Sequence, residues 1–154
     1  MQADAKSMNE IIVSVMQGAA GVELGNAGCA VAPNDDSYSA EVRLSGEWQG
    51  MLQVQISQNL AREVAGTMLH RQHQWLDETS VMDAVGEITN MIAGNLRPLV
   101  DGARRMSVPV VRYHRQEIAP LGEALLDCAF SRGGRSMDVR LIGGAEGGRS
   151  WNRA

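Results

Sequence analysis

The chain has 154 residues, a formal net charge of -4 at pH 7 and 44% hydrophobic residues. This length suffices for one sizeable hydrophobic core but is too short for two ordinary domains joined by a linker. Because the chain is acidic and has no basic run interleaved with aromatic residues, its charge gives no basis for binding nucleic acid or an anionic membrane surface. Lys6 is the only lysine, which excludes Schiff-base and P-loop chemistry in the body of the chain.

Targeting signals and cysteine spacing both indicate a cytoplasmic protein. Mixed charges precede the first apolar stretch, and no apolar run approaches about 18 residues, so the sequence predicts neither a signal peptide nor a membrane span. Cys29 and Cys128 lie far apart, without the close spacing of a zinc or thioredoxin motif. We expect both to be buried free thiols rather than a disulfide.

The first part of the chain reads as one helix followed by strands. Apolar residues recur at helical spacing from Ala5 to about Ala20, which predicts an amphipathic helix. Strand patterns follow at Gly28–Val31, Ser39–Leu44 and Trp48–Ile56. The Ser45-Gly46-Glu47 stretch predicts a hairpin turn between the last two strands.

Two helices and three strands are predicted in the remainder. Ser57 is a plausible N-cap for a helix that reaches Leu69. Asp77 or Thr79 can cap a longer helix that runs to about Leu96, where Arg97 and Pro98 favour its end. The predicted strands are Ser107–His114, Leu121–Ser131 and Ser136–Ile142, with Gly133-Gly134 as the last turn.

This order of elements is typical of an α+β domain. We expect a largely antiparallel sheet with a first helix and a central two-helix layer packed on it. The domain is expected to span residues 1–144, and the glycine- and arginine-rich residues 145–154 are expected to form a flexible tail.

The long third helix carries two different faces. At about 100° per residue, its apolar residues fall within one sector of roughly 80° that we expect to pack on the sheet: Val81, Val85, Ile88, Ile92, Leu96 and Leu99. A second stripe lies roughly opposite and should face outward: Asp83, Glu87, Asn90, Gly94 and Arg97.

The outward stripe contains residues that weaken a helix. Asn is a poor helix-interior residue and each Gly costs about 1 kcal/mol relative to Ala, and Gly86, Asn90, Gly94 and Asn95 all fall within this segment. Such local faults often mark functional sites. From spacing alone, however, a solvated carboxylate at Glu87 and a tolerated surface amide at Asn90 is the favoured interpretation.

The extended string Gly86-Glu87-Ile88-Thr89-Asn90-Met91-Ile92-Ala93-Gly94-Asn95 closely resembles the signature helix of the CheX, CheC and FliY phosphatase family. The strand at Gly50–Ile56, the helix at Leu60–Leu69 and the segment Ser107–Val111 also resemble that family in order and spacing. The resemblance covers roughly Met8 to Gly143. Because one motif is visible, the chain is most similar to the single-motif CheX branch, which implies a homodimer.

The resemblance implies a phosphatase that removes the phosphoryl group from an aspartate of a CheY-like receiver domain. Asn90 would hold the attacking water in line, and Glu87 would pair with the receiver's phosphate-binding lysine. The receiver would supply Mg²⁺, so the chain would need no metal ligand or cofactor of its own. The residues expected to support docking of the receiver are Asp83, Gly86, Gly94 and Arg97. Pro98 looks atypical for the end of this helix.

Other interpretations stay open at this point. The same fold can serve as a non-catalytic adaptor, akin to flagellar switch components, in which the outward face binds a partner without hydrolysis. A small-molecule hydrolase would need a nucleophile beside a base, but His70 and His73 have no evident Cys or acidic partner. These two histidines without further ligands are more often surface residues than a metal pair. Trp48, Trp75 and Trp151 fit an interface or core covers equally well.

Overall fold

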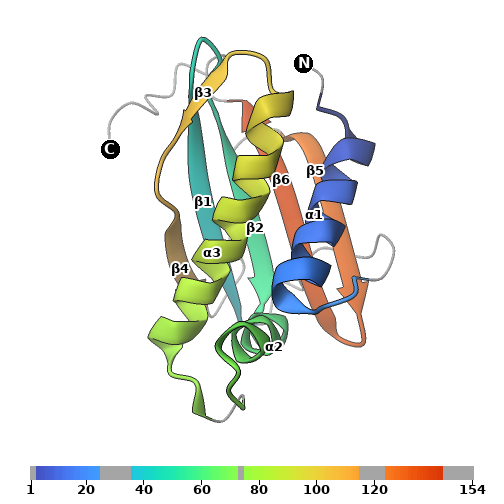
Figure 1. Ribbon diagram of the computed structural model, residues 1–154, viewed down its shortest axis with the longest axis vertical. Coiled ribbons are helices and arrows are strands. Elements are labelled where there is room, and N and C mark those ends of the chain that lie inside the picture. Colours follow the sequence, from blue (N-terminus) through green and yellow to red (C-terminus); the bar gives the residue numbers. More distant parts are fainter. Residues whose placement is uncertain (1–2, 25–35, 73–74, 115–123, 144–154) are drawn as a thin grey trace.

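The computed structural model of the protein describes residues 3–24, 36–72, 75–114 and 124–143. Helices α1 and α3 lie side by side over one face of a six-stranded antiparallel sheet, and α2 crosses one end of it (Figure 1). The expected α+β class is therefore confirmed. The elements are α1 (Ala5–Ala20), β1 (Ser37–Gly46), β2 (Gly50–Ser57), α2 (Gln58–Leu69), α3 (Glu78–Leu96), the 3₁₀ turn η2 (Arg97–Leu99), β3 (Ala103–Met106), β4 (Val110–His114), β5 (Ala124–Arg132) and β6 (Arg135–Gly143).

The sheet has the order β3-β1-β2-β6-β5, and β4 also pairs with β1 beside β3. Residues that alternate along β1 and β2 turn their side chains toward the helices, as the period of two predicts. In the register of these strands Val42 lies opposite Leu52, and Leu52 lies opposite Leu141 of β6. All three are fully buried, so the central strands supply the floor of the hydrophobic core.

Helix α1 has the bounds that its apolar spacing predicts. Asp4 stands at the N-cap, and its Oδ1 accepts a hydrogen bond from the amide of Ser7 at 2.7 Å. Gly21 ends the helix with φ of 62°, a left-handed conformation that glycine adopts without a steric cost. The helix buries the residues that face α3 and the sheet: Met8, Ile12, Val15, Met16 and Ala20.

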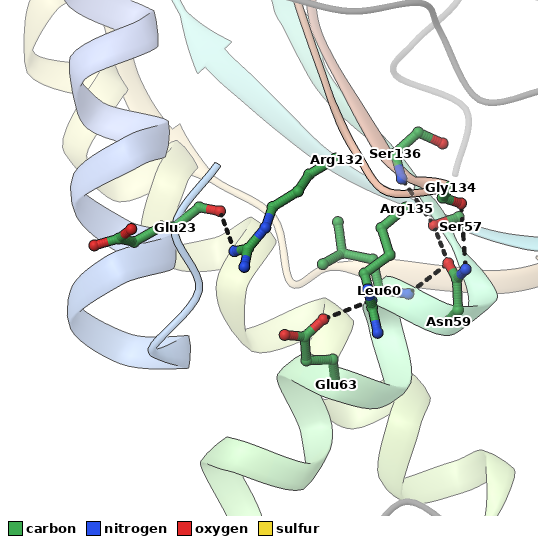
Figure 2. A network of polar contacts seen from close by, with 9 residues as sticks. All are labelled: Glu23, Ser57, Asn59, Leu60, Glu63, Arg132, Gly134, Arg135 and Ser136. Atoms are coloured by element: carbon green, nitrogen blue, oxygen red, sulfur yellow. Dashed lines mark hydrogen bonds and ion pairs between the residues drawn. The ribbon is translucent and has the colours of Figure 1, made fainter. Parts of the chain in front are cut away.

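The start of α2 confirms Ser57 as the N-cap residue, but the Ser57 side chain makes no capping hydrogen bond. Its hydroxyl instead donates to Asn59 Oδ1 at 2.6 Å and accepts from the amide of Ser136 at 3.0 Å. Asn59 Oδ1 accepts from the Leu60 amide, and its Nδ2 donates to the carbonyl of Gly134. Figure 2 shows how this network joins the start of α2 to the β5–β6 turn.

Two arginines extend that network from the β5–β6 hairpin toward the helices (Figure 2). Arg135 pairs with Glu63 of α2, with Nε 2.8 Å from Oε2. Arg132 donates from Nη1 to the carbonyl of Glu23, just beyond α1, at 3.0 Å. The hairpin turn itself forms at Gly133 and Gly134, which both have positive φ, as the sequence predicted.

The edge next to β1 differs from the prediction of one strand over Ser107–His114. The chain forms two short strands, β3 and β4, which pair with different ends of β1. Pro109 has no amide hydrogen to donate and lies between them. Ser107 bridges the gap because its amide donates to the Arg43 carbonyl, while its Oγ accepts from the Arg43 amide. The strand β3 was missed because its residues, Ala-Arg-Arg-Met, do not alternate in polarity.

Several predictions lie outside the described residues: the strand Gly28–Val31, the first residues of Leu121–Ser131, the tail at 145–154, and the residues Cys29, His73 and Trp151. Cys128 is a free thiol and is partly rather than fully buried. Trp48 packs against the core, where its indole fills the space above Gly50, whereas Trp75 is 70% exposed. Trp48 is thus a core cover. Within the part of the chain that is described, no helix is long and apolar enough to cross a membrane.

Candidate functional site

Helix α3 positions the residues that the sequence marked as functional. It begins after Asp77, whose Oδ1 accepts a hydrogen bond from the Ser80 amide at 2.7 Å. These hydrogen bonds to Ser80 hold the pKa of the Asp77 carboxyl below its usual value. The helix ends at Leu96, and the chain continues as a 3₁₀ turn in which Pro98 takes one of the first two positions. Both boundaries agree with the sequence.

The two faces of α3 differ in the way that its periodicity predicted. The inward side is buried against the sheet and the neighbouring helices: Val81, Val85, Ile88, Ile92 and Leu96. On the outward side Asp83, Glu87 and Gly94 are exposed, and Asn90 and Arg97 are half-buried. Glu87 and Asn90 are three residues apart on this outward side, so that their side chains are neighbours.

Neither Glu87 nor Asn90 has a hydrogen bond or ion pair with any residue that the structure describes. Other polar residues on α3 behave differently, because Thr89 Oγ1 donates to the Val85 carbonyl at 2.7 Å and Asn95 Nδ2 donates to the Met91 carbonyl at 2.8 Å. Such bonds to the preceding turn are the ordinary use of these side chains within a helix. No described residue therefore occupies the Glu87 carboxylate or the Asn90 carboxamide.

Gly86 lies differently from the expectation that placed it among the docking residues. It is buried, and a Cβ built on it would lie 3.3 Å from Val111 Cγ2 and 3.5 Å from Pro109 Cγ. The small residue lets β4 and the segment before it approach α3 closely. Gly86 thus lies on the flank of the helix that β4 and Pro109 cover, about 100° around the helix axis from Glu87.

Gly94 lies where the expectation placed it, on the outward side two turns beyond Glu87. A Cβ built on Gly94 would meet nothing within 4 Å. No packing contact within the described chain therefore requires glycine here, although glycine costs the helix about 1 kcal/mol relative to Ala. The result is a stretch of helix surface with little relief beside Asn90.

Arg97 is the last residue of the outward stripe and lies at the end of α3. Its Nη1 donates to the carbonyl oxygen of Arg104 at 2.9 Å, which holds the guanidinium against β3. Arg104 in turn pairs with Glu47, which lies in the β1–β2 turn. The stripe is consequently acidic in its first half, at Asp83 and Glu87, and basic at its end.

Among the described residues, the histidines give no support for a hydrolytic or metal centre. His70 is exposed and ends α2 in a left-handed conformation with φ of 54°. His114 Nε2 lies 2.7 Å from Ser39 Oγ, and burial lowers the pKa of this imidazole. Over the ranges that the structure describes, no group of three or more His, Cys, Asp or Glu side chains could hold a metal ion.

The fold and the outward motif together define a helix-against-sheet domain whose central helix presents two polar side chains that have no partner among the described residues. The family model for the chemotaxis phosphatase CheX matches residues 38–130, more than half of the chain. The chain therefore belongs to the CheX family. No match was found among curated proteins.

Solved structures agree with this assignment at the level of the fold. The CheX chemotaxis protein of Vibrio vulnificus has a TM-score of 0.74 at 22% identity, over 94% of this chain and 99% of that one. The complex of CheX with CheY, BeF₃ and Mg²⁺ from Borrelia burgdorferi gives 0.74 at 21% identity, over 93% and 99%. FliY of Thermotoga maritima gives 0.57 at 12% identity, over 93% and 92%.

Proposed function

We propose that the chain is a phosphatase that accelerates hydrolysis of the aspartyl phosphate on a CheY-like receiver domain. The observation that carries this proposal is the pair Glu87 and Asn90, which are neighbours on the outward side of α3 and have no partner among the described residues. Membership in the CheX family supports the reaction class. The Borrelia burgdorferi complex, in which another CheX binds CheY, supports the class of partner.

The proposed reaction requires neither a nucleophile nor a metal ligand from this chain. A water oxygen forms a bond to phosphorus while the bond from phosphorus to the receiver's aspartate oxygen breaks, which leaves inorganic phosphate and a free carboxylate. The barrier to such a transfer is lowered chiefly by orientation and by neutralising charge. The receiver's Mg²⁺ would neutralise the phosphoryl oxygens, so the contribution left to this chain is to place the water.

Asn90 has the chemistry for that task. Its carboxamide can accept a hydrogen bond from the water through Oδ1 and can donate one through Nδ2. An amide is not a base at neutral pH, so Asn90 would act through the position it gives the water. The rigid, packed side of α3 would hold the Asn90 backbone in place as the receiver docks.

Glu87 would fix the orientation of the docked receiver. Its exposed carboxylate can form a charge-assisted hydrogen bond with the lysine that binds phosphate in the receiver. This contact would form next to Asn90, because residues three apart on a helix have their Cβ atoms about 5–6 Å from each other. Asp83, Gly94 and Arg97 would contact the receiver around this pair.

The test is to follow loss of phosphate from phosphorylated CheY-like receivers encoded in the same genome, in the presence of Mg²⁺. The wild-type protein should accelerate the loss, and Asn90→Ala should not. Asn9→Ala is the matched control, because it also removes an exposed helix amide, but from the side of α1 away from α3. A non-catalytic adaptor is the alternative, and it predicts that receivers bind without faster loss of phosphate and that Asn90→Ala binds them as well as the wild type.

The cytoplasmic location and the homodimer belong to the same proposal. A receiver that is phosphorylated by a cytoplasmic kinase would be met in that compartment. The sheet offers two outer edges for pairing with a second copy, namely β5 on one side and β3 with β4 on the other. Light scattering of the purified protein would give a mass of twice 16.6 kDa for the homodimer.

A further inference from the structure

The outward side of α3 has a second row of residues besides the one that leads to Asn90. Residues four apart form a ridge along a helix. From the exposed Glu87 this ridge passes through the half-buried Met91 to the exposed Asn95, and it turns gradually toward the buried side, where Leu99 of η2 is half-buried. The row leads toward α1, whereas Asn90 lies four residues after Gly86, which packs against β4. Glu87 thus lies where the two rows meet.

A groove of about 300 Å³ lies where this second row meets α1. The two helices run side by side over the sheet there (Figure 1). The groove is lined on α1 by Ser7, Glu10, Ile11 and Ser14. On the other side it is lined by Asn95 of α3 and Leu99 of η2. The residues of α1 at the rim are small or exposed, so the groove is open to solvent.

The lining combines an apolar floor with hydrogen-bond acceptors. Ile11 and Leu99 are half-buried hydrophobic residues. The carboxylate of Glu10 is exposed and has no ion-pair partner among the residues described. Asn95 uses its Nδ2 for the Met91 carbonyl, which leaves its Oδ1 as an acceptor. A long aliphatic stem that ends in a cation matches this combination.

We propose that the groove between α1 and α3 receives a lysine or arginine side chain from the receiver domain. The inference rests on the proposed function, because Glu87 and Asn90 place the receiver over this part of α3. The stem of the side chain lies over Ile11 and Leu99, and its cationic head pairs with Glu10. This contact adds to the charge complementarity that Asp83 and Glu87 already offer to a basic surface.

The size of a docked domain makes this contact accessible. A standard protein interface covers about 800 Å² on each partner, which is far more than two side chains provide. Asn95 is eight residues beyond Glu87, a distance of about 12 Å along the helix axis. Gly94 adds no side chain between them, so a receiver seated on Glu87 and Asn90 reaches the groove without an obstruction from α3.

The experiment compares pairs of variants in α1 and just beyond its end. Each variant is tested for binding to CheY-like receivers from the same genome that have been activated with beryllofluoride and Mg²⁺. Glu10→Lys reverses the groove charge, and Glu23→Lys makes the same change at an exposed position beyond the end of α1. Ser14→Trp fills the groove, and Gln17→Trp adds the same bulk to α1 outside it. Circular dichroism checks that all four variants are folded.

The expected result is a Kd about tenfold higher for Glu10→Lys and Ser14→Trp, in the range for rim and interface changes, with Glu23→Lys and Gln17→Trp close to wild type. The KM for the phosphorylated receiver rises in parallel, while turnover at saturating receiver still depends on Asn90. If Glu10→Lys and Ser14→Trp both bind with wild-type affinity while Asn90→Ala loses turnover, the groove proposal is wrong and the phosphatase proposal stands. Absence of binding by the wild-type protein to every receiver overturns both.

Discussion

Arg97 Nη1 donates to the carbonyl oxygen of Arg104 at 2.9 Å, and this bond ties the end of the motif helix α3 to the edge strand β3. The hydrogen bond thus connects the last residue of the outward stripe to the edge of the sheet. It also holds a positive charge at the C-terminal end of the helix, where the helix dipole favours cations.

Replacing Arg97 with Met should lower the free energy of unfolding by about 1 kcal/mol, because a charge-assisted hydrogen bond is lost while much of the aliphatic stem is kept. Urea unfolding gives this value. Arg105→Met is the matched control, since Arg105 is an exposed arginine on β3, next to the acceptor residue Arg104, and its side chain has no hydrogen bond or ion pair with the described residues. Equal stability of the two variants would show that the Arg97 bond contributes nothing.

Gly94→Ala should raise the free energy of unfolding by about 0.5–1 kcal/mol, because alanine favours the helix and its Cβ meets no neighbour. Gly18→Ala should stabilise α1 similarly, since the space around Gly18 is also open. The two variants should differ in receiver binding. If Gly94 lies under the docked receiver, the added methyl group weakens binding only in Gly94→Ala, and equal affinities for both variants would contradict that placement.

Gly50→Ala should destabilise the protein by about 2–4 kcal/mol, in contrast to the two changes above. A Cβ at Gly50 would collide with the Trp48 indole and would lie 2.5 Å from the backbone carbonyl oxygen of Ile142. The backbone atom cannot move aside without disturbing the β2–β6 pairing. Thermal unfolding should show a large fall in Tm, and an unchanged Tm would contradict the close approach.

The pH dependence of stability should report on Asp138 of β6. Burial first, and then the neighbouring Asp127 carboxyl, raise the pKa of Asp138 to about 7. Arg140 opposes this shift with Nε 3.8 Å from Asp138 Oδ2, but it lies closer to Asp127, at 3.2 Å. The groups opposite on β2, Gln53 and Gln55, are uncharged. Asp138 is therefore protonated in the folded protein below about pH 7.

The raised pKa of Asp138 determines whether the free energy of unfolding rises or falls with pH. The folded state holds a proton that the unfolded state releases above about pH 4, so the stabilising contribution is lost as the pH rises toward 7. Asp138→Asn removes this dependence. The difference in unfolding free energy, variant minus wild type, should thus be larger at pH 8 than at pH 5 by about 2–3 kcal/mol. A difference that is independent of pH would contradict the raised pKa.

Local sequence signals predicted the elements that position the site. Asp77 was one of two candidate N-caps, and Arg97-Pro98 indicated the end of α3 near Leu96. The period of its apolar residues separated the buried from the outward side. These features act within a few residues along the chain, which is why they can be read without a structure. The extended string around Glu87 and Asn90 likewise identified the family before any contact was known.

Contacts between distant segments were not predicted. Gly86 was expected among the residues that support docking of the receiver, but β4, more than 20 residues later in the chain, packs over it. Ser57 stands at the N-cap of α2 as expected, but its hydroxyl accepts a hydrogen bond from the Ser136 amide in the other half of the protein and makes no capping bond. The groove beside α1 also depends on two helices that are far apart in the sequence.

The most direct test of the central claim is the rate at which phosphorylated CheY-like receivers lose phosphate with Mg²⁺ and a catalytic amount of this protein. We predict that the wild-type protein and Asn9→Ala accelerate the loss over many turnovers, and that Asn90→Ala binds the receiver but does not accelerate it. Acceleration that persists in Asn90→Ala would contradict the role of this residue, and no acceleration of any receiver by the wild type would contradict the phosphatase itself.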